Sequence, residues 1–254
     1  MTSISGNQQN ANSPDAALRQ VQEFICEKLR GKSVRIYEAG GGSASVLPLS
    51  SLTNRTIVVV DIDENQIRNN NYADTKILGD IQTYEFPANS FDLIACYNVI
   101  EHIPAVDRAL SQFHHALAPG GLLFIGAPNP HSLFGMLTKY SPHWFHVWYY
   151  RVILKRQNAG MPGQVPFRTI YHPLVSPKAL LAFCEQIGLE PIYFNTYVGS
   201  NYTYVRDGRP FIGLLLKALV STMNALTLGR QKFEYGDYHV VLAKPPKSTG
   251  LRKP

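Results

Sequence analysis

The sequence predicts an α/β protein with a doubly wound, mostly parallel sheet of seven strands, helices on both faces, an aromatic-rich insertion and an extra apolar helix. Short β-branched runs alternate with helical or loop segments, acidic residues follow several of these runs, and a row of glycines follows the first. The composition agrees with this prediction. Because 45% of the 254 residues are hydrophobic and only 17% are charged, the chain is typical of packed globular proteins.

Each element follows from a local pattern. A helix is predicted from Pro14 to Leu29, since its apolar residues recur at helical spacing and Gly31 stands just past its end. Strands are predicted at 34–37, 57–60, 76–78, 92–96, 122–126, 191–195 and 238–243. Further helices are predicted near 44–52, from 64, at 105–117 and at 177–187, with a turn at 119–121 before the fifth strand.

One domain is predicted over residues 14–245, a length that suits a single α/β unit with embellishments. Insertions are predicted at about 128–175 and 197–236. Residues 1–13 are rich in Ser, Asn and Gln, lack the features of a signal peptide and are expected to form a disordered tail. A flexible tail is expected at 246–254.

The cysteines indicate a reducing compartment. Cys26, Cys96 and Cys184 are odd in number and widely spaced, and they form no C-x-x-C pair. Neither a disulfide framework nor a zinc site is therefore predicted. We expect a cytoplasmic protein.

A glycine turn follows the first predicted strand, in the segment E-A-G-G-G-S-A-S that begins at Glu38. Glycines at positions 40 and 42 permit a tight turn and a close approach of the backbone to a ligand. Ser45 stands where a dinucleotide fingerprint has its third glycine, and Glu38 would repel a pyrophosphate. A ligand with an ammonium and a sulfonium, S-adenosylmethionine, would be attracted instead. The other interpretation is a turn that serves packing only.

Acidic residues mark the ends of the next two strands. Asp61, before Ile62, is placed to accept both hydroxyl groups of a ribose, while Asp63 is expected to cap the following helix. Asp80, which precedes Ile81, would reach the same sheet edge, where it could read an adenine amino group or simply form a turn.

Five segments in chain order carry a resemblance to a known family: E-A-G-G-G-S-A, V-V-V-D-I-D, G-D-I, F-D-L-I-A-C-Y-N-V-I-E-H-I and L-A-P-G-G-L-L-F-I-G-A-P-N. They resemble the motifs of the class I S-adenosylmethionine-dependent methyltransferases, especially the small-molecule, type 11 or quinone-biosynthesis branch. The resemblance covers about residues 34–130, with a weaker echo at 177–195, and implies a Rossmann-like fold. The chain departs from the family at Ala44, where a third glycine is common, and in its two long insertions.

The resemblance also implies the roles of the site residues. The implied cofactor site comprises Glu38, Gly40, Gly42, Asp61, Ile62, Asp80, Ile81 and Asn98. In it, Glu38 would lie near the methionine amino group, Asp61 on the ribose and Asp80 with Ile81 at the adenine. Asn98 would line the active site. No metal is required, because the sulfonium already makes methyl transfer favourable and the protein mainly aligns the reactants.

If the acceptor is an alcohol or a phenol, a base must take its proton. His102, just beyond the fourth strand, is the first candidate, and a structural role at the strand exit is the alternative. His131, His143, His146 and His172 of the insertion are further candidates. They have no Cys, Asp or Glu at metal-ligand spacing, so a metal site is not predicted.

Charge is unevenly distributed along the chain, which has 24 Lys and Arg against 18 Asp and Glu, a formal net charge of +6. Residues 108–184 contain no acidic residue and seven Lys or Arg. The insertion at about 128–175, which lies within this stretch, would form the acceptor pocket. It could receive an acidic or phosphate-bearing acceptor or sit against anionic lipid, or it could be a solvated basic surface without a partner. Nucleic acid is not expected, since V-I follows Asn98 in place of the N-P-P-[YF] signature.

The apolar segment 209–229 is predicted to form a helix bracketed by Pro210 and Gly229. It is not expected to span a membrane, because Lys217 in its middle would cost about 2.5–3.5 kcal/mol there. Two interpretations remain. The helix packs on the domain or on a second copy in a homodimer, or it inserts shallowly at a membrane surface, which would make the cytoplasmic protein peripheral.

The sequence as a whole predicts an enzyme (EC 2.1.1.-) that moves a methyl group from S-adenosylmethionine to a small-molecule acceptor, at oxygen. One alternative is an NAD(P)-dependent oxidoreductase, which Glu38 and Ser45 disfavour. The other is a non-catalytic protein that binds the cofactor or acts as a scaffold. It predicts cofactor binding without turnover.

Overall fold

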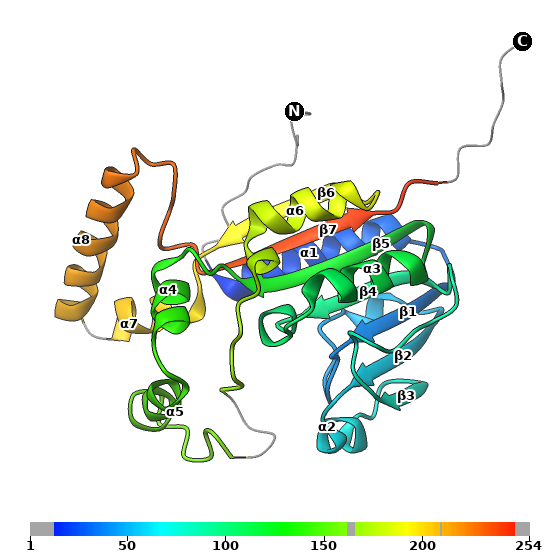
Figure 1. The fold of residues 1–254 in the computed structure, drawn as a ribbon, viewed down its shortest axis with the longest axis horizontal. Coiled ribbons are helices and arrows are strands. Elements are labelled where there is room, and N and C mark those ends of the chain that lie inside the picture. Colours follow the sequence, from blue (N-terminus) through cyan, green and yellow to red (C-terminus); the bar gives the residue numbers. More distant parts are fainter. Residues whose placement is uncertain (1–12, 162–165, 209, 247–254) are drawn as a thin grey trace, which may run out of the picture.

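A seven-stranded sheet in the order β3-β2-β1-β4-β5-β7-β6 forms the centre of the protein (Figure 1). The computed structural model describes residues 13–161, 166–208 and 210–246. The strands are β1 (Val34–Ala39), β2 (Arg55–Asp61), β3 (Thr75–Leu78), β4 (Phe91–Tyr97), β5 (Leu117–Pro128), β6 (Glu190–Tyr197) and β7 (Asp237–Ala243). The first five are parallel, and β7 runs antiparallel to both β5 and β6. The predicted doubly wound, mostly parallel sheet is confirmed.

Helices cover both faces of the sheet and create two hydrophobic cores. Helix α1 (Pro14–Leu29) buries Val21 and Ile25 against one face, together with Ile36 of β1. Helices α3 (Val106–Ala116) and α6 (Pro177–Gln186) pack on the other face. The β-branched and aliphatic runs that predict the strands are buried on both sides, which explains their unbroken apolar character.

Most of the two predicted tails, residues 1–12 and 247–254, lies outside the described residues. Ser13, assigned to the first tail, is instead the N-cap of α1, and its hydroxyl accepts the N–H of Ala16 at 3.3 Å.

The predicted helix near 44–52 is wrong. The chain runs there through turns and forms only a short 3₁₀ helix, Leu49–Ser51. The cause is local, because Pro48 has no N–H for a helical hydrogen bond and disfavours helical geometry at the residue before it. In addition, the Ser45 hydroxyl accepts the N–H of Leu47 at 3.0 Å, which fixes a turn.

Strand β5 begins earlier than predicted, at Leu117 rather than 122, so the glycine turn at 119–121 lies within its span. Leu117 pairs with Phe91 before the register shifts. The turn is hydrogen-bonded to the residue that follows β7, since the N–H of Gly120 donates to the carbonyl of Lys244 at 2.7 Å.

Four helices lie beyond the carboxyl ends of β5 and β6, at one end of the sheet (Figure 1). They are α4 (Leu133–Tyr140), α5 (His143–Val152), α7 (Ser200–Gly208) and α8 (Pro210–Leu226). A small core of Leu133, Tyr202 and Val220 joins α4, α7 and α8. Gly213 allows α8 to meet α7 closely, because a Cβ there would lie 2.1 Å from the carbonyl oxygen of Arg206.

Among the described helices, α8 included, none combines the length and the apolar character that a membrane crossing requires.

Candidate active site

The parallel strands bring the predicted site residues to one edge of the sheet. Strands β1 and β2 are in register up to the pair Ala39–Val60, and the N–H of Gly40 donates to the carbonyl of Val60 at 2.8 Å. The glycine turn after β1 and Asp61 at the end of β2 therefore lie side by side. Asp80 and Asn98 follow β3 and β4 at the same edge.

Asp61 holds the glycine turn in place. Its Oδ2 accepts the N–H of Gly42 at 2.9 Å, and its Oδ1 accepts the N–H of Asp63 at 2.9 Å. Each carboxylate oxygen has a second lone pair, so Asp61 can still accept hydrogen bonds from a ligand. Two side chains complete the support: Gln66 accepts the N–H of Ser43 at 3.1 Å, and Asn70 donates to the carbonyl of Gly42 at 2.7 Å.

Gly40 and Gly42 have the conformations that glycine favours, with φ of +67° and +56°. At Gly40 there is also no room for a side chain, because a Cβ would lie 2.5 Å from a methyl carbon of Val99. Val99 directly follows Asn98. The turn after β1 and the loop after β4 are thus in van der Waals contact across the candidate site.

Glu38 is buried at the end of β1, with an exposed fraction of 2%. Its carboxylate accepts hydrogen bonds from the hydroxyls of Ser45 and, at 2.9 Å, Tyr72. Burial raises the pKa of Glu38 from its usual value, and the two hydroxyl donors oppose that rise. The Ser45 hydroxyl therefore donates a hydrogen bond to Glu38 from the position where a dinucleotide fingerprint has glycine.

The remaining predicted cofactor residues differ in exposure. Ile62 is 76% exposed beside Asp61, whereas Ile81 is buried. Asp63 caps α2 (Glu64–Asn69) as predicted, accepting the N–H groups of Asn65 and Gln66 at 2.8 and 3.2 Å. The Oδ1 of Asp80 accepts the N–H of Gln82 at 2.9 Å, the turn-forming role left open by the sequence.

Asn98 is exposed at the end of β4 and has a positive φ of 54°, a conformation that asparagine tolerates better than most residues. Its N–H donates to the carbonyl of Gly126 at 2.8 Å. The glycine turn, Asp61, Ile62, Asp80 and Asn98 thus share one edge, as the sequence predicts. The role of each residue toward a ligand stays a prediction.

His102 lies in the 3₁₀ helix Ile100–His102, under the returning end of the insertion. Its Nδ1 lies 2.9 Å from the carbonyl oxygen of Arg168, so Nδ1 carries the hydrogen and Nε2 has the free lone pair. The ring meets Phe167 edge-on at 5.9 Å between ring centres. Burial lowers the pKa of His102, which keeps the imidazole neutral and able to accept a proton.

The other histidines have structural contacts or lie apart. The Nδ1 of His172 accepts the N–H of Leu174 at 3.3 Å, and the Nε2 of His146 lies 2.8 Å from the hydroxyl of Ser141. His131 and His143 are exposed. Across residues 13–161, 166–208 and 210–246, no three His, Cys, Asp or Glu side chains gather as ligands for a metal ion.

Two carboxyl groups near this edge, buried Glu101 and partly buried Asp237, have no motif in the sequence that marks them. Burial raises the pKa of Asp237 to about 7 and that of Glu101 to about 8, and the charge of Asp237 adds to the rise at Glu101. Oε2 of Glu101 is buried and has no hydrogen-bond partner among the described residues. The sequence marks Glu101 only as the neighbour of His102, and Asp237 only as the residue before the last predicted strand, 238–243.

Asp237 also lines a cavity of about 100 Å³ between β7 and helices α4 and α7. Ser132, Tyr171 and Tyr202 are among its other walls. Because β5 alone separates β4 from β7, the backbones of Asn98 and Asp237 are about 10 Å apart, two strand spacings. The cavity therefore adjoins the candidate cofactor edge on the side of the insertion.

We expect Glu101→Gln to flatten the pH dependence of stability. The folded-state pKa of Glu101, about 8, lies above the unfolded value of about 4.3, so the folded protein binds more protons and loses stability as pH rises between these values. Melting curves at pH 5, 6.5 and 8.5 should show that the melting temperature falls more steeply with pH in wild type than in the variant. The variant should melt roughly 5 °C higher than wild type at pH 8.5. Exposed Glu64→Gln is the control, and parallel curves for wild type and Glu101→Gln would contradict the expectation.

Comparisons with known proteins agree with this geometry. A family model described as a methyltransferase domain matches residues 11–193. An S-adenosylmethionine-dependent methyltransferase structure from Archaeoglobus fulgidus is 18% identical, with a TM-score of 0.57 over 91% of this chain and 95% of that one. One from Methanosarcina mazei is 15% identical, with a TM-score of 0.53 over 88% and 98%.

A third similar structure is the [4+2]-cyclase SpnF, 15% identical with a TM-score of 0.55 over 95% of this chain and 86% of that one. No curated protein sequence matches the chain. At these identities the similar structures show the fold alone, and the family rests on the match over 11–193.

Proposed function

The chain belongs to the class I S-adenosylmethionine-dependent methyltransferases, and we propose that it transfers the methyl group of this cofactor to an oxygen atom of a small-molecule acceptor. The observation that supports a cofactor site here is the hydrogen bond that the Asp61 carboxylate accepts from the N–H of Gly42. It joins the two elements that a nucleoside-bearing cofactor needs at one sheet edge, a close backbone approach and a carboxylate for hydroxyl groups.

The residues at this edge fit S-adenosylmethionine. Positive φ at Gly40 and Gly42 opens the turn to a ligand, and Glu38 supplies a negative charge behind it. Asp61 has lone pairs left for ribose hydroxyls, and exposed Ile62 offers an apolar contact for the adenine ring. A pyrophosphate would meet the Glu38 carboxylate, so the NAD(P) alternative is disfavoured.

When bound, the cofactor supplies a methyl group on a sulfonium sulfur, and this sulfur leaves as a neutral thioether. In the proposed transfer the acceptor hydroxyl loses its proton, a new carbon–oxygen bond forms and the carbon–sulfur bond breaks. We propose that Nε2 of His102 takes the proton, because the contact of Nδ1 with Arg168 leaves the lone pair on Nε2. Oε1 of Glu101 lies 3.7 Å from this nitrogen. The acceptor would reach it under the insertion, beside the cavity lined by Asp237.

We also propose that the protein is cytoplasmic. All three cysteines are free thiols, and two of them, Cys96 and Cys184, are buried, as is usual in a reducing compartment.

We expect His102→Ala to lower the turnover number about 10²- to 10⁴-fold, the usual contribution of a general base, while the affinity for S-adenosylmethionine stays intact. Release of S-adenosylhomocysteine is measured on a panel of alcohols, phenols and lipids with hydroxyl groups. His102→Asn is the companion variant, since its amide can still donate to the Arg168 carbonyl but cannot act as a base. If the turnover number of His102→Asn equals that of wild type, His102 has only a structural role. Cofactor binding without turnover on any acceptor would favour the non-catalytic alternative.

A further inference from the structure

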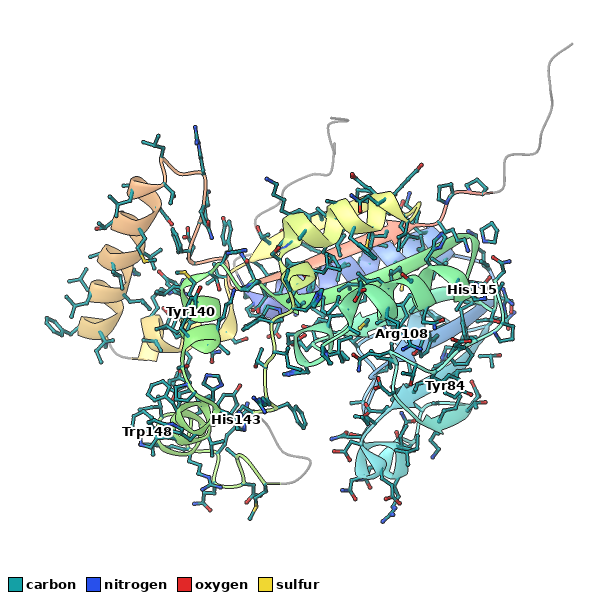
Figure 2. All side chains as sticks on the ribbon, viewed as in Figure 1. Tyr84, Arg108, His115, Tyr140, His143 and Trp148 are labelled. Carbon is teal, nitrogen blue, oxygen red and sulfur yellow. The ribbon has the colours of Figure 1, made fainter. Side chains whose placement is uncertain are left out.

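The end of the molecule beyond the cofactor edge carries large apolar side chains exposed to solvent. Figure 2 shows Tyr140, His143 and Trp148 there, far from Tyr84, Arg108 and His115. We call this region the apolar end surface and define it by Trp144, Phe145 and Trp148 of α5 with Phe211, Leu214 and Leu215 of α8. Trp144 is 68% exposed and Phe211 73%. Exposed apolar side chains gathered in this way mark interaction sites.

The side chains on α5 are ordered against each other rather than against the core. Phe145 stacks on Trp148 with ring centres 5.5 Å apart, and Trp144 meets Phe145 edge-on at 6.1 Å. None of the residues of α5 is buried. Tryptophan and other aromatic residues are favoured where one part of a surface lies in apolar surroundings and another in water.

Helix α8 is apolar on both sides. Gly213 and Val220 face α7 and the small core, whereas Phe211, Leu214 and Leu215 are exposed on the outer side. The packing inside the molecule therefore explains only one face of α8. The outer face is largely exposed among the residues that the structure describes, so it is the part that a partner would cover.

Charge indicates which partner covers it. Six exposed cations lie on or near the two helices: Lys139, Arg151, Lys155, Lys217, Arg230 and Lys232. No Asp or Glu occurs between Arg108 and Cys184, or between Asp207 and Glu234. None of the six cations forms an ion pair within residues 13–161, 166–208 and 210–246.

This charge pattern disfavours a second copy of the chain and favours lipid. A two-fold dimer would place the same surface on both sides of the interface, so a surface on which cations outnumber acidic residues would face its own copy. Anionic phospholipid head groups supply the missing negative charge, and aromatic and leucine side chains can enter the boundary of the acyl region.

We propose that the apolar end surface docks on an anionic phospholipid bilayer and that the acceptor is a hydroxyl-bearing lipid taken from that bilayer; the second part rests on the proposed function. Helices α5 and α8 follow strands β5 and β6 at the carboxyl edge, the edge that holds Asp61 and Asn98. A bilayer against these helices would therefore lie on the side where the acceptor enters.

The chain offers a direct probe of docking, because its only two tryptophans, Trp144 and Trp148, both lie in α5. We expect their fluorescence to shift to shorter wavelength with vesicles of phosphatidylcholine containing about one third phosphatidylglycerol. Lipid with brominated acyl chains should quench it. Vesicles of phosphatidylcholine alone should bind on the order of tenfold more weakly, and salt should weaken binding to the anionic vesicles.

Three variants separate the parts of the surface. Leu214→Ser with Leu215→Ser keeps both tryptophans and should lower vesicle affinity on the order of tenfold. Arg151→Glu with Lys155→Glu should remove the preference for anionic lipid. Leu78→Ser, which changes a 56% exposed leucine on β3, is the matched control and should bind vesicles like wild type.

Two results would overturn the docking proposal. One is a tryptophan fluorescence spectrum that does not shift with anionic vesicles, and the other is equal vesicle binding by wild type and by Leu214→Ser with Leu215→Ser. If wild type is a dimer in sedimentation equilibrium and the double variant Trp144→Ser with Trp148→Ser is a monomer, the surface is assigned to a second copy instead. Titration with S-adenosylmethionine in the absence of vesicles is the separate test of the proposed function, because docking and cofactor binding can fail independently. Turnover of soluble acceptors alone, with no lipid methylated in docked vesicles, would overturn the lipid acceptor.

Discussion

Gly40→Ala is expected to destabilise the protein by about 2–5 kcal/mol and to abolish measurable binding of S-adenosylmethionine. The positive φ of 67° costs about 1–2 kcal/mol for any residue with a side chain. The rest arises because the new methyl group would lie 2.5 Å from Val99, so the loop after β4 must move away from the glycine turn. Both sides of the candidate site would shift. The free energy of unfolding is measured with urea, and cofactor affinity by calorimetry.

Gly31→Ala provides the matched control for this change. Gly31 also has a positive φ, of 75°, but a Cβ there has no atom within 4 Å. The control should therefore lose only about 1–2 kcal/mol and keep its cofactor affinity. Equal destabilisation in the two variants would contradict the contact between the turn and Val99, and full affinity in Gly40→Ala would contradict the placement of the cofactor on the turn.

Asp61→Ala is expected to weaken S-adenosylmethionine binding by about 1–3 kcal/mol, or roughly 5- to 150-fold. Two losses combine in this variant. The ribose hydroxyls lose a charged acceptor, and the N–H of Gly42 loses the carboxylate that holds it at 2.9 Å. The affinity is measured by isothermal titration, with a thermal melt to verify folding.

The control is Asp92→Ala, because Asp92 also accepts a hydrogen bond from a backbone N–H, but at the amino ends of the strands, away from the candidate site. Its Oδ2 accepts the N–H of Arg35 at 2.9 Å, and the residue lies at the start of β4. Asp92→Ala removes the same charge and should lower stability while leaving cofactor affinity within about twofold of wild type. If Asp61→Ala binds as tightly as Asp92→Ala does, Asp61 has no role toward the ribose.

The strands and the order of the site residues could be predicted from sequence because both depend on local pattern. Unbroken apolar runs mark strands buried on both faces, and in a parallel sheet their carboxyl ends fall at one edge. Glu38, Asp61 and Asn98 each lie at or just after a strand end, so their proximity follows from topology alone.

The supports of the site could not be predicted in the same way. Tyr72 contacts Glu38 across 34 positions of sequence and has no motif of its own. The helix predicted near 44–52 is wrong because the spacing of the segment suggests a helix, while Pro48 and the hydroxyl of Ser45 favour a turn. The raised pKa of Asp237 depends on burial, which only the folded chain provides.

The central claim is that the edge formed by the glycine turn, Asp61 and Asn98 binds S-adenosylmethionine, and isothermal titration of the wild-type protein tests it most directly. S-adenosylmethionine and S-adenosylhomocysteine are titrated into folded protein, with NADH and NADPH as controls. We expect micromolar binding of the first pair and none of the second. Binding of NADH or NADPH alone, or of none of the four, would contradict the account and leave the glycine turn as a feature of packing.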